Sequence, residues 1–164
     1  MRVLVADGQA AVRSALRRLL KEEPGLIVVG EVVRADELLD QAAATQPDLV
    51  LLDCELCGLS ASFRPTAGQA RWRLLDALHR LRSHPKVIVL SGRPEMRQAA
   101  LDAGADAFVS KGNPPERLLT ILRTFNADCN SGDSVVQTTG TSAVNFPGDC
   151  DASGGFQVEQ EEAV

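Results

Sequence analysis

An unbroken apolar run from Leu49 to Leu52 constrains this chain more than any other stretch of its sequence. The run follows Pro47 and Asp48 and ends on the carboxylate of Asp53. A strand with one face in water alternates apolar and polar residues, whereas this run has no polar position, so we expect a parallel strand covered on both faces. Asp53 then lies at the carboxyl end of the strand. Open α/β sheets place their ligands beyond that end, which makes Asp53 a candidate functional residue.

Short apolar segments and amphipathic segments alternate through residues 1–125. The apolar segments, rich in β-branched residues, are expected strands at 2–6, 26–33, 48–53, 86–90 and 107–109. The segments between and after them carry apolar residues at helical spacing. Proline, glycine and capping residues mark the expected helix ends, at Pro24-Gly25 after the first, Asp36-Glu37 in the second, Gln69 before the third, Pro94 and Gly104 around the fourth, and Asn113-Pro114 before the fifth.

Strict alternation of strand and helix, with right-handed crossovers, requires a parallel sheet with helices on both faces. The predicted fold is therefore an α/β, flavodoxin-like, doubly wound (βα)5 domain over residues 1–125, with strand order 2-1-3-4-5.

Residues 126–164 break this pattern. They hold seven acidic residues and no Lys or Arg, whereas residues 1–125 carry 15 acids against 17 bases, so the net charge of −5 comes from this segment and the rest of the chain is near neutral. The segment is rich in Gly, Ser, Thr, Asn and Asp, and its large apolar residues are Phe146 and Phe156. So little apolar surface does not offset the entropy lost on ordering, and we expect an acidic, disordered tail.

The length of 164 residues suits one ordinary domain that folds without disulfides. The amino terminus does not resemble a secretion signal, and no apolar run reaches the roughly 20 residues that span a bilayer. We therefore expect a cytoplasmic protein without a membrane segment. Cys54 and Cys57 have the spacing of a redox or metal motif. They follow a strand beside carboxylates rather than cations, so we interpret the pair as incidental.

Direct DNA binding requires clustered Lys and Arg residues to neutralise phosphates, and the segment after residue 125 has none. The sequence therefore predicts no nucleic-acid partner for that segment. Arg71-Trp72-Arg73 could stack on nucleic acid. We instead interpret Trp72 as covering an edge of the core and the two arginines as a solvated face.

Polar residues end four of the expected strands, and they are Asp7, Asp53, Ser91 and Lys111. The first and third strands are neighbours in the predicted order, so the carboxylates of Asp7 and Asp53 should converge. Two carboxylates with open coordination positions suit Mg²⁺. With this cation present, Asp53 can attack a phosphoryl donor, Lys111 can neutralise charge on the transferred group, and Ser91 can donate a hydrogen bond to it.

Four motifs make residues 2–125 resemble the receiver domains of two-component response regulators. They are Val-Ala-Asp7, Leu-Leu-Asp53, Val-Leu-Ser91-Gly and Ala-Gly-Ala-Asp-Ala-Phe108-Val-Ser-Lys111. The resemblance implies that Asp53 accepts a phosphoryl group from a histidine kinase or phosphotransfer protein. It also implies that Asp7, Asp53 and the backbone carbonyl of Glu55 hold Mg²⁺.

The same resemblance implies that Ser91 and Lys111 contact the phosphoryl group and that Ser91 and Phe108 form a switch pair. It implies a signalling phosphoacceptor rather than an enzyme, with an unknown downstream protein partner. The signal would pass through the fourth helix, fifth strand and fifth helix, and a homodimer could form through the same surface.

Several positions depart from the family pattern. Gly8 stands where the family has a second acid that binds the metal directly, so we expect weakened Mg²⁺ binding. Cys57 replaces a common proline after the phosphorylated aspartate, Gly112 replaces a common proline after Lys111, and the loop before the third helix is long. All these changes lie around the site or on the surface that contacts partners.

Three alternatives stay open. A degenerate receiver that binds partners without phosphorylation would not accept a phosphoryl group from acetyl phosphate. A truncated transcriptional response regulator depends on how the gene continues. A flavodoxin-like enzyme or flavin carrier would need a hydroxyl-rich phosphate-binding loop after the first strand, where this chain has Asp7-Gly8-Gln9-Ala10.

Overall fold

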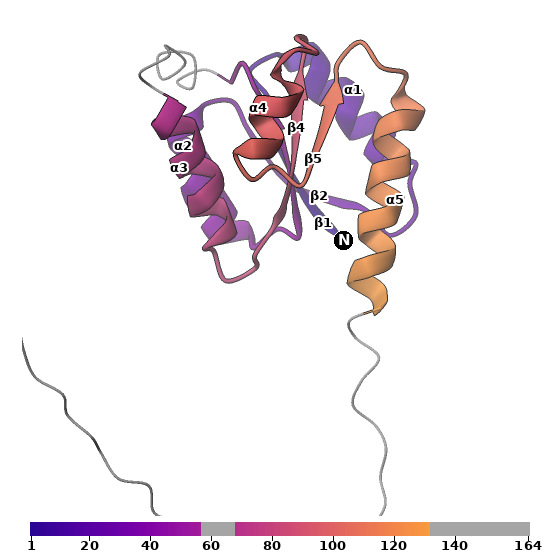
Figure 1. The fold of residues 1–164 in the computed structure, drawn as a ribbon. Helices are drawn as coiled ribbons and strands as arrows, with labels where there is room; N and C mark the ends of the chain where they lie inside the picture. Colours follow the sequence, from indigo (N-terminus) through magenta and orange to yellow (C-terminus); the bar gives the residue numbers. More distant parts are fainter. Residues whose placement is uncertain (57–67, 132–164) are drawn as a thin grey trace, which may run out of the picture. The chain divides into compact units, whose positions relative to one another are not determined.

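A computed structural model describes residues 1–56 and 68–131 of the chain, and the side chains of residues 1–56 and 74–127. Strands and helices alternate along it (Figure 1), in the order β1 (Arg2–Ala6), α1 (Ala10–Lys21), β2 (Ile27–Val32), α2 (Ala35–Thr45), β3 (Leu49–Asp53), α3 (Gly68–His79), β4 (Lys86–Ser91), α4 (Met96–Asp102), β5 (Ala107–Ser110) and α5 (Pro115–Ser131). The five strands form one sheet in the order β2-β1-β3-β4-β5. All strand pairs are parallel, which confirms the predicted fold.

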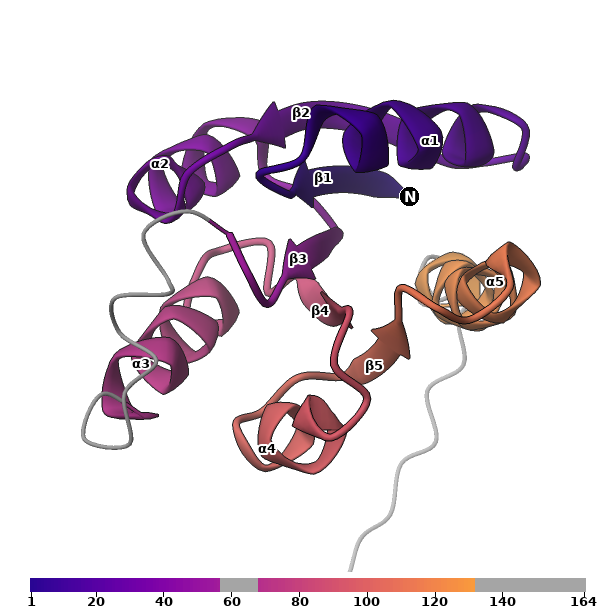
Figure 2. The same cartoon turned by 90° about the horizontal axis from the view of Figure 1, so that it is seen from above.

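The helices cover the two faces of the sheet in two groups. Helices α1 and α5 lie on one face, and α2, α3 and α4 lie on the other (Figure 2). Strand β3 shows why its sequence has no polar alternation. Leu49 and Leu51 belong to the core under α1 and α5, while Val50 and Leu52 belong to the core under α2, α3 and α4. Both faces are therefore buried, as the apolar run predicted.

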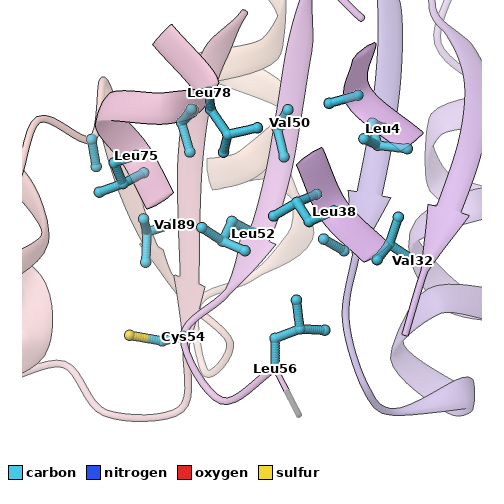
Figure 3. Packing of buried hydrophobic residues seen from close by; sticks show 14 of the residues in the cluster. Leu4, Val32, Leu38, Val50, Leu52, Cys54, Leu56, Leu75, Leu78 and Val89 are labelled. Carbon is cyan, nitrogen blue, oxygen red and sulfur yellow. The ribbon is translucent and has the colours of Figure 1, made fainter. Parts of the chain in front are cut away.

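The core under α2, α3 and α4 continues up to the end of the sheet that carries the candidate site. Figure 3 shows Leu52, Cys54 and Leu56 following one another toward the loop after β3. The Cys54 side chain is buried and belongs to this apolar cluster. The end of β3 is thus fixed by packing on both sides, which holds Asp53 in a set position.

Two expected helix boundaries were wrong. The fourth helix spans Met96 to Asp102 and so begins two residues after Pro94. The residues before it form single turns, in which the amides of Met96 and Arg97 donate to the carbonyls of Arg93 and Pro94. The fifth helix extends to Ser131, so residues 126–131, assigned to the tail from their composition, are helical. The second strand is shorter than expected by one residue at each end.

Contacts near the end of α5 explain why the helix continues past its apolar stripe. Arg123 donates two hydrogen bonds to the Glu23 carboxylate, at 2.6 and 3.0 Å. Gly25 has a φ of 79°, and a Cβ built on it would lie 3.2 Å from Nδ2 of Asn126. The turn between α1 and β2 therefore supports α5 as far as Asn126.

The remaining expectations for the tail, Cys57, and the Arg71, Trp72 and Arg73 side chains lie outside the described residues. Within the described part of the chain, no helix is both long and apolar enough to cross a membrane.

Truncation after Ser131 is expected to change the melting temperature by less than about 3 °C, because the removed sequence is poor in large apolar residues. Truncation after Phe125 is the matched control. It removes Asn126 and the end of α5, and should destabilise the domain measurably more. Thermal unfolding followed by circular dichroism compares the two. If the chain truncated after Ser131 melts more than about 8 °C below the full chain, residues beyond 131 contribute to the folded core.

Candidate functional site

Asp7, Asp53 and Lys111 meet at the carboxyl ends of three strands. Asp7 follows β1, Asp53 ends β3 and Lys111 follows β5. The Lys111 ammonium lies 2.8 Å from Oδ2 of Asp7 and 2.9 Å from Oδ1 of Asp53. The Asp7 and Asp53 side chains are 0% and 1% exposed, and that of Lys111 is 19% exposed. The structure thus brings together two buried carboxylates and one cation from distant parts of the sequence.

Backbone groups fix the position of Asp7. Its Oδ1 accepts a hydrogen bond of 2.7 Å from the Gln9 amide, its own amide bonds the Val32 carbonyl at 3.1 Å, and its carbonyl accepts from Arg13 at 2.9 Å. Both carboxylate oxygens of Asp7 therefore have partners, since Oδ2 accepts from Lys111. Asp7 is a fixed negative charge at the end of the sheet.

Asp53 is oriented differently. Its Oδ1 accepts from the Glu55 amide at 3.0 Å and also pairs with Lys111, while within the described residues no hydrogen bond or ion pair reaches its Oδ2. Burial raises the pKa of Asp53, with a smaller contribution from the nearby Asp7 charge, and the Glu55 amide and Lys111 oppose this rise. One oxygen of Asp53 is thus held in place and the other is left for chemistry.

Lys111 stays charged in this environment. Burial by itself would lower the pKa of Lys111, but the hydrogen bonds and charges of Asp7 and Asp53 outweigh it, so the pKa is raised. The ammonium is therefore a permanent cation beside Oδ1 of Asp53.

Ser91 ends β4, the neighbour of β3, and its side chain is buried. Its Oγ accepts a hydrogen bond of 3.0 Å from the Arg93 amide, which leaves the hydroxyl hydrogen free to donate. Its carbonyl accepts from the Lys111 amide at 2.7 Å, which ties the ends of β4 and β5 together. Phe108 of β5 is partly buried and packs on the core under α4. Ser91 and Phe108 therefore lie on neighbouring strands, near the site and near α4 respectively.

The two carboxylates converge, since the ammonium of Lys111 lies within 2.9 Å of an oxygen of each, and carboxylate oxygens brought together in this way suit a divalent cation. Asp7 and Asp53 would hold Mg²⁺ with water molecules completing its shell. The Glu55 backbone carbonyl as a third ligand stays a prediction. The position after Asp7 supplies no carboxylate, since it is Gly8. In the parts of the chain that the structure describes, no group of three or more His, Cys, Asp and Glu residues could hold a metal.

Sequence reasoning missed an ion pair beside this site. Arg93 Nε lies 3.1 Å from Glu55 Oε1, and the pair joins the segments that follow β4 and β3. Glu55 is two residues after Asp53, and Arg93 is two residues after Ser91. Because the two strands are neighbours, this equal spacing could have predicted that the two opposite charges meet.

An apolar groove of about 330 Å³ opens next to Lys111, between α1 and the start of α5. Its walls include Val12, Ala15 and Leu19 on one side and Pro114 and Leu118 on the other. Lys111 itself lines this groove, so the groove opens directly beside the candidate site.

Comparison with known proteins agrees with this arrangement. The family model for the response regulator receiver domain matches residues 3–123. The response regulator GacA of Pseudomonas viridiflava is 33% identical over 128 residues, covering 75% of this chain and 54% of GacA. The nitrate/nitrite response regulator NarL of Escherichia coli K12 is 28% identical over 122 residues, covering 73% of this chain and 52% of NarL. This chain thus spans about half the length of these two curated relatives.

Solved structures give the same result. The receiver domain protein (CheY-like) of Methanospirillum hungatei superimposes with a TM-score of 0.62 at 26% identity, covering 80% of this chain and 97% of that one. The sequence match, the strand order and the residues at the strand ends lead to one conclusion. The chain belongs to the response regulator receiver domain family.

Proposed function

We propose that this receiver accepts a phosphoryl group on Asp53 from a histidine kinase or phosphotransfer protein and relays the signal through protein contacts. The observation that carries the proposal is the placement of one ammonium, that of Lys111, between the carboxylates of Asp7 and Asp53. Charge gathered in this way suits the transfer of an anionic phosphoryl group, which depends on neutralisation by nearby cations.

In the proposed reaction, Oδ2 of Asp53 attacks the phosphorus of the donor. A phosphorus–oxygen bond forms as the phosphorus–nitrogen bond of the phosphohistidine breaks, and the electron pair of that bond stays on the imidazole nitrogen. Oδ1 keeps its hydrogen bond from the Glu55 amide, so the carboxylate is held while it reacts. In this proposal, Lys111 and the hydroxyl of Ser91 contact the transferred group.

Mg²⁺, bound by Asp7 and Asp53, would neutralise negative charge on the oxygens of the phosphoryl group. The chain supplies the fixed charges around it. Asp7 is held by the Gln9 amide and Asp53 by the Glu55 amide, so neither carboxylate has to reorganise when a cation arrives.

The proposed relay starts at Ser91. Val89, two residues before Ser91 on β4, is paired with Phe108 of β5, which packs on the core under α4. We propose that Ser91 and Phe108 change together and alter the surface of α4, β5 and α5. That surface would contact the downstream protein or a second copy of the chain.

The proposal is tested with acetyl phosphate and Mg²⁺. We expect intact-protein mass spectrometry to detect one added phosphoryl group on the native chain and none on the Asp53→Asn variant. Asp53→Asn keeps the size of the side chain but lacks the nucleophilic oxygen pair of a carboxylate.

Two other results are informative. A phosphoryl group on Asp53→Asn would place the acceptor elsewhere. An unmodified native chain would favour the second candidate function, a receiver that binds its partner without phosphorylation, for which the missing third acid at Gly8 is the supporting observation.

A further inference from the structure

Strand β2 forms an edge of the sheet that carries exposed apolar side chains. It is the first strand in the order β2-β1-β3-β4-β5, so within the described residues one side of its backbone has no neighbouring strand (Figure 2). Large apolar side chains are exposed at Ile27, by 63%, and at Val33, by 41%. Ile27 is the first residue of β2, and Val33 directly follows its last residue. Exposed apolar residues along an open strand edge mark a place where another extended segment can add to the sheet.

An apolar hollow of about 260 Å³ lies beside the start of this edge strand. It is lined by residues of α1, of β2 and of the turn between them, namely Arg17, Leu20, Lys21, Leu26, Ile27 and Val28. We call it the β2 hollow. It lies at the amino ends of the strands, because Ile27 is paired with Arg2 at the start of β1. The β2 hollow is therefore at the opposite end of the sheet from the candidate site.

Helix α1 adds positive charge to the rim of the β2 hollow. Its residues include four cations and no acid, and Arg13 and Arg17 share the Glu31 carboxylate of β2 at 3.2 and 3.4 Å. Among the described residues, no ion pair or side-chain hydrogen bond reaches Arg18 or Lys21. Lys21 is exposed and lines the hollow. An apolar depression thus lies next to a cation that has no anionic partner in the described part of the chain.

We propose that the open edge of β2 and the β2 hollow bind an extended acidic segment of a partner protein. A large apolar side chain of the segment occupies the hollow, and acidic side chains contact Arg17 and Lys21. Residues i and i+2 of a strand share a face, so the segment carries its acids two positions from the apolar residue. Backbone pairing supplies affinity, while the hollow and the cations supply selectivity. The pairing is short, because the register of β2 shifts opposite Val3 and Leu4.

A second copy of this chain is a poorer occupant of the same edge. Two copies that paired antiparallel through β2, about a two-fold axis perpendicular to the sheet, would have both α1 helices on one face. The exposed cations Arg18 and Lys21 of the two copies would then approach one another, and like charges repel. An acidic segment removes this repulsion and supplies the anions that the rim lacks.

The test follows the backbone amide shifts of the full chain during titration with short peptides. Thr-Glu-Thr-Leu-Thr-Glu-Thr is expected to shift amides of residues 27–33 and to bind more weakly as salt is added. Thr-Lys-Thr-Leu-Thr-Lys-Thr, with the charges reversed, should bind at least about tenfold more weakly. Thr-Glu-Thr-Ser-Thr-Glu-Thr keeps the charges but lacks the apolar side chain, and should bind at least about threefold more weakly.

Two substitutions on α1 provide a matched comparison. Lys21→Gln is expected to weaken binding of the acidic peptide about two- to fivefold, because it removes a cation from the rim. Arg18→Gln is the control, since Arg18 is also an exposed cation of α1 but does not line the hollow. Both positions are exposed, so neither change removes a core contact. No phosphoryl donor is needed, so this proposal and the proposed phosphorylation of Asp53 stand or fall separately.

Several outcomes would overturn the proposal. Equal binding of the acidic and basic peptides, or equal effects of Lys21→Gln and Arg18→Gln, would mean that the rim does not recognise acids. Shifts confined to residues outside 17–33 would place the peptide elsewhere. Shifts of residues 27–33 that depend on protein concentration without peptide would make a second copy the occupant. Binding to vesicles of anionic phospholipid, weakened by Lys21→Gln and without peptide binding, would assign the surface to a membrane.

Discussion

Replacing Lys111 with methionine is expected to lower the free energy of unfolding by about 3 kcal/mol at neutral pH, because it leaves two buried carboxylates without their cation. Methionine has nearly the length and volume of lysine, so the change removes the charge with little loss of packing. For a domain of this size the melting temperature should fall by about 10 °C or more.

The pH dependence of this loss follows from Asp53. Burial raises the pKa of Asp53 and Lys111 lowers it, so removing Lys111 raises this pKa further. A carboxyl group whose pKa is raised on folding binds its proton more tightly in the folded state, and stability increases as the pH falls through that folded-state pKa. The Lys111→Met variant should therefore be most destabilised at neutral pH and approach the native chain under mildly acidic conditions.

Lys86→Met is the matched control. Lys86 also pairs with a carboxylate, Asp106 at 2.9 Å, but its side chain is exposed. That substitution is expected to cost less than about 1 kcal/mol. Urea unfolding of both variants at two pH values gives the comparison. Equal losses for the two variants, or a Lys111→Met deficit that does not shrink at lower pH, would contradict the account of a buried cation between two carboxylates.

The sequence contained most of the information for the fold because burial on both faces leaves a clear pattern. The run from Leu49 to Leu52 is apolar at every position, since alternate residues face different helix layers. Parallel strands must be joined by crossovers, and these repeat the strand–helix unit along the chain. The meeting of Asp7, Asp53 and Lys111 could be predicted, because one end of a parallel sheet collects the carboxyl ends of all its strands.

The strand register and the length of the last helix depend on tertiary contacts and could not be predicted from the sequence. The register of β1 against β2 shifts between Val3 and Leu4, and a Cβ on Gly30 of β2 would lie 3.0 Å from Leu4 Cδ1. The extension of α5 beyond Phe125 follows from Gly25 and Glu23, which are far away in sequence. The composition suggested that the tail begins at Asn126, because the residues after Phe125 lack the apolar repeat that identifies an amphipathic helix.

At the site, sequence identified the residues but not their pairing. Lys111 was expected to neutralise a phosphoryl group, whereas in the folded chain it also bridges Asp7 and Asp53. The ion pair of Glu55 with Arg93 depends on two side chains that are 38 residues apart. Neither arrangement leaves a local pattern, because each depends on which strands become neighbours.

Introducing an acid at Gly8 is expected to tighten Mg²⁺ binding about tenfold or more, because affinity at such sites rises with the number of anionic ligands. Asp7 and Asp53 offer two carboxylates, and the position after Asp7 is a glycine. The backbone permits the change. Among the glycines of the described residues, positive φ values occur at Gly25 and Gly104, so an aspartate at position 8 needs no left-handed conformation.

Without metal, the same variant is expected to be less stable than the native chain. A third carboxylate beside Asp7 and Asp53 shares the single ammonium of Lys111, which already contacts both. Like charges at this distance repel, and burial strengthens the repulsion. Gly8→Asp should thus lower the melting temperature in the presence of a chelator and raise it, relative to the native chain, at millimolar Mg²⁺.

Gly8→Asn is the matched control, since it adds a side chain of the same size without the charge. Mg²⁺ titrations followed by melting temperature, and by the amide shifts of residues near Asp53, would be run on all three proteins. The phosphorylation rate with acetyl phosphate should rise in Gly8→Asp and not in Gly8→Asn, because only the acid adds an anionic ligand. If Gly8→Asp and the native chain bind Mg²⁺ equally well, position 8 does not face the cation, and the metal site proposed for this receiver would have to be held by other ligands.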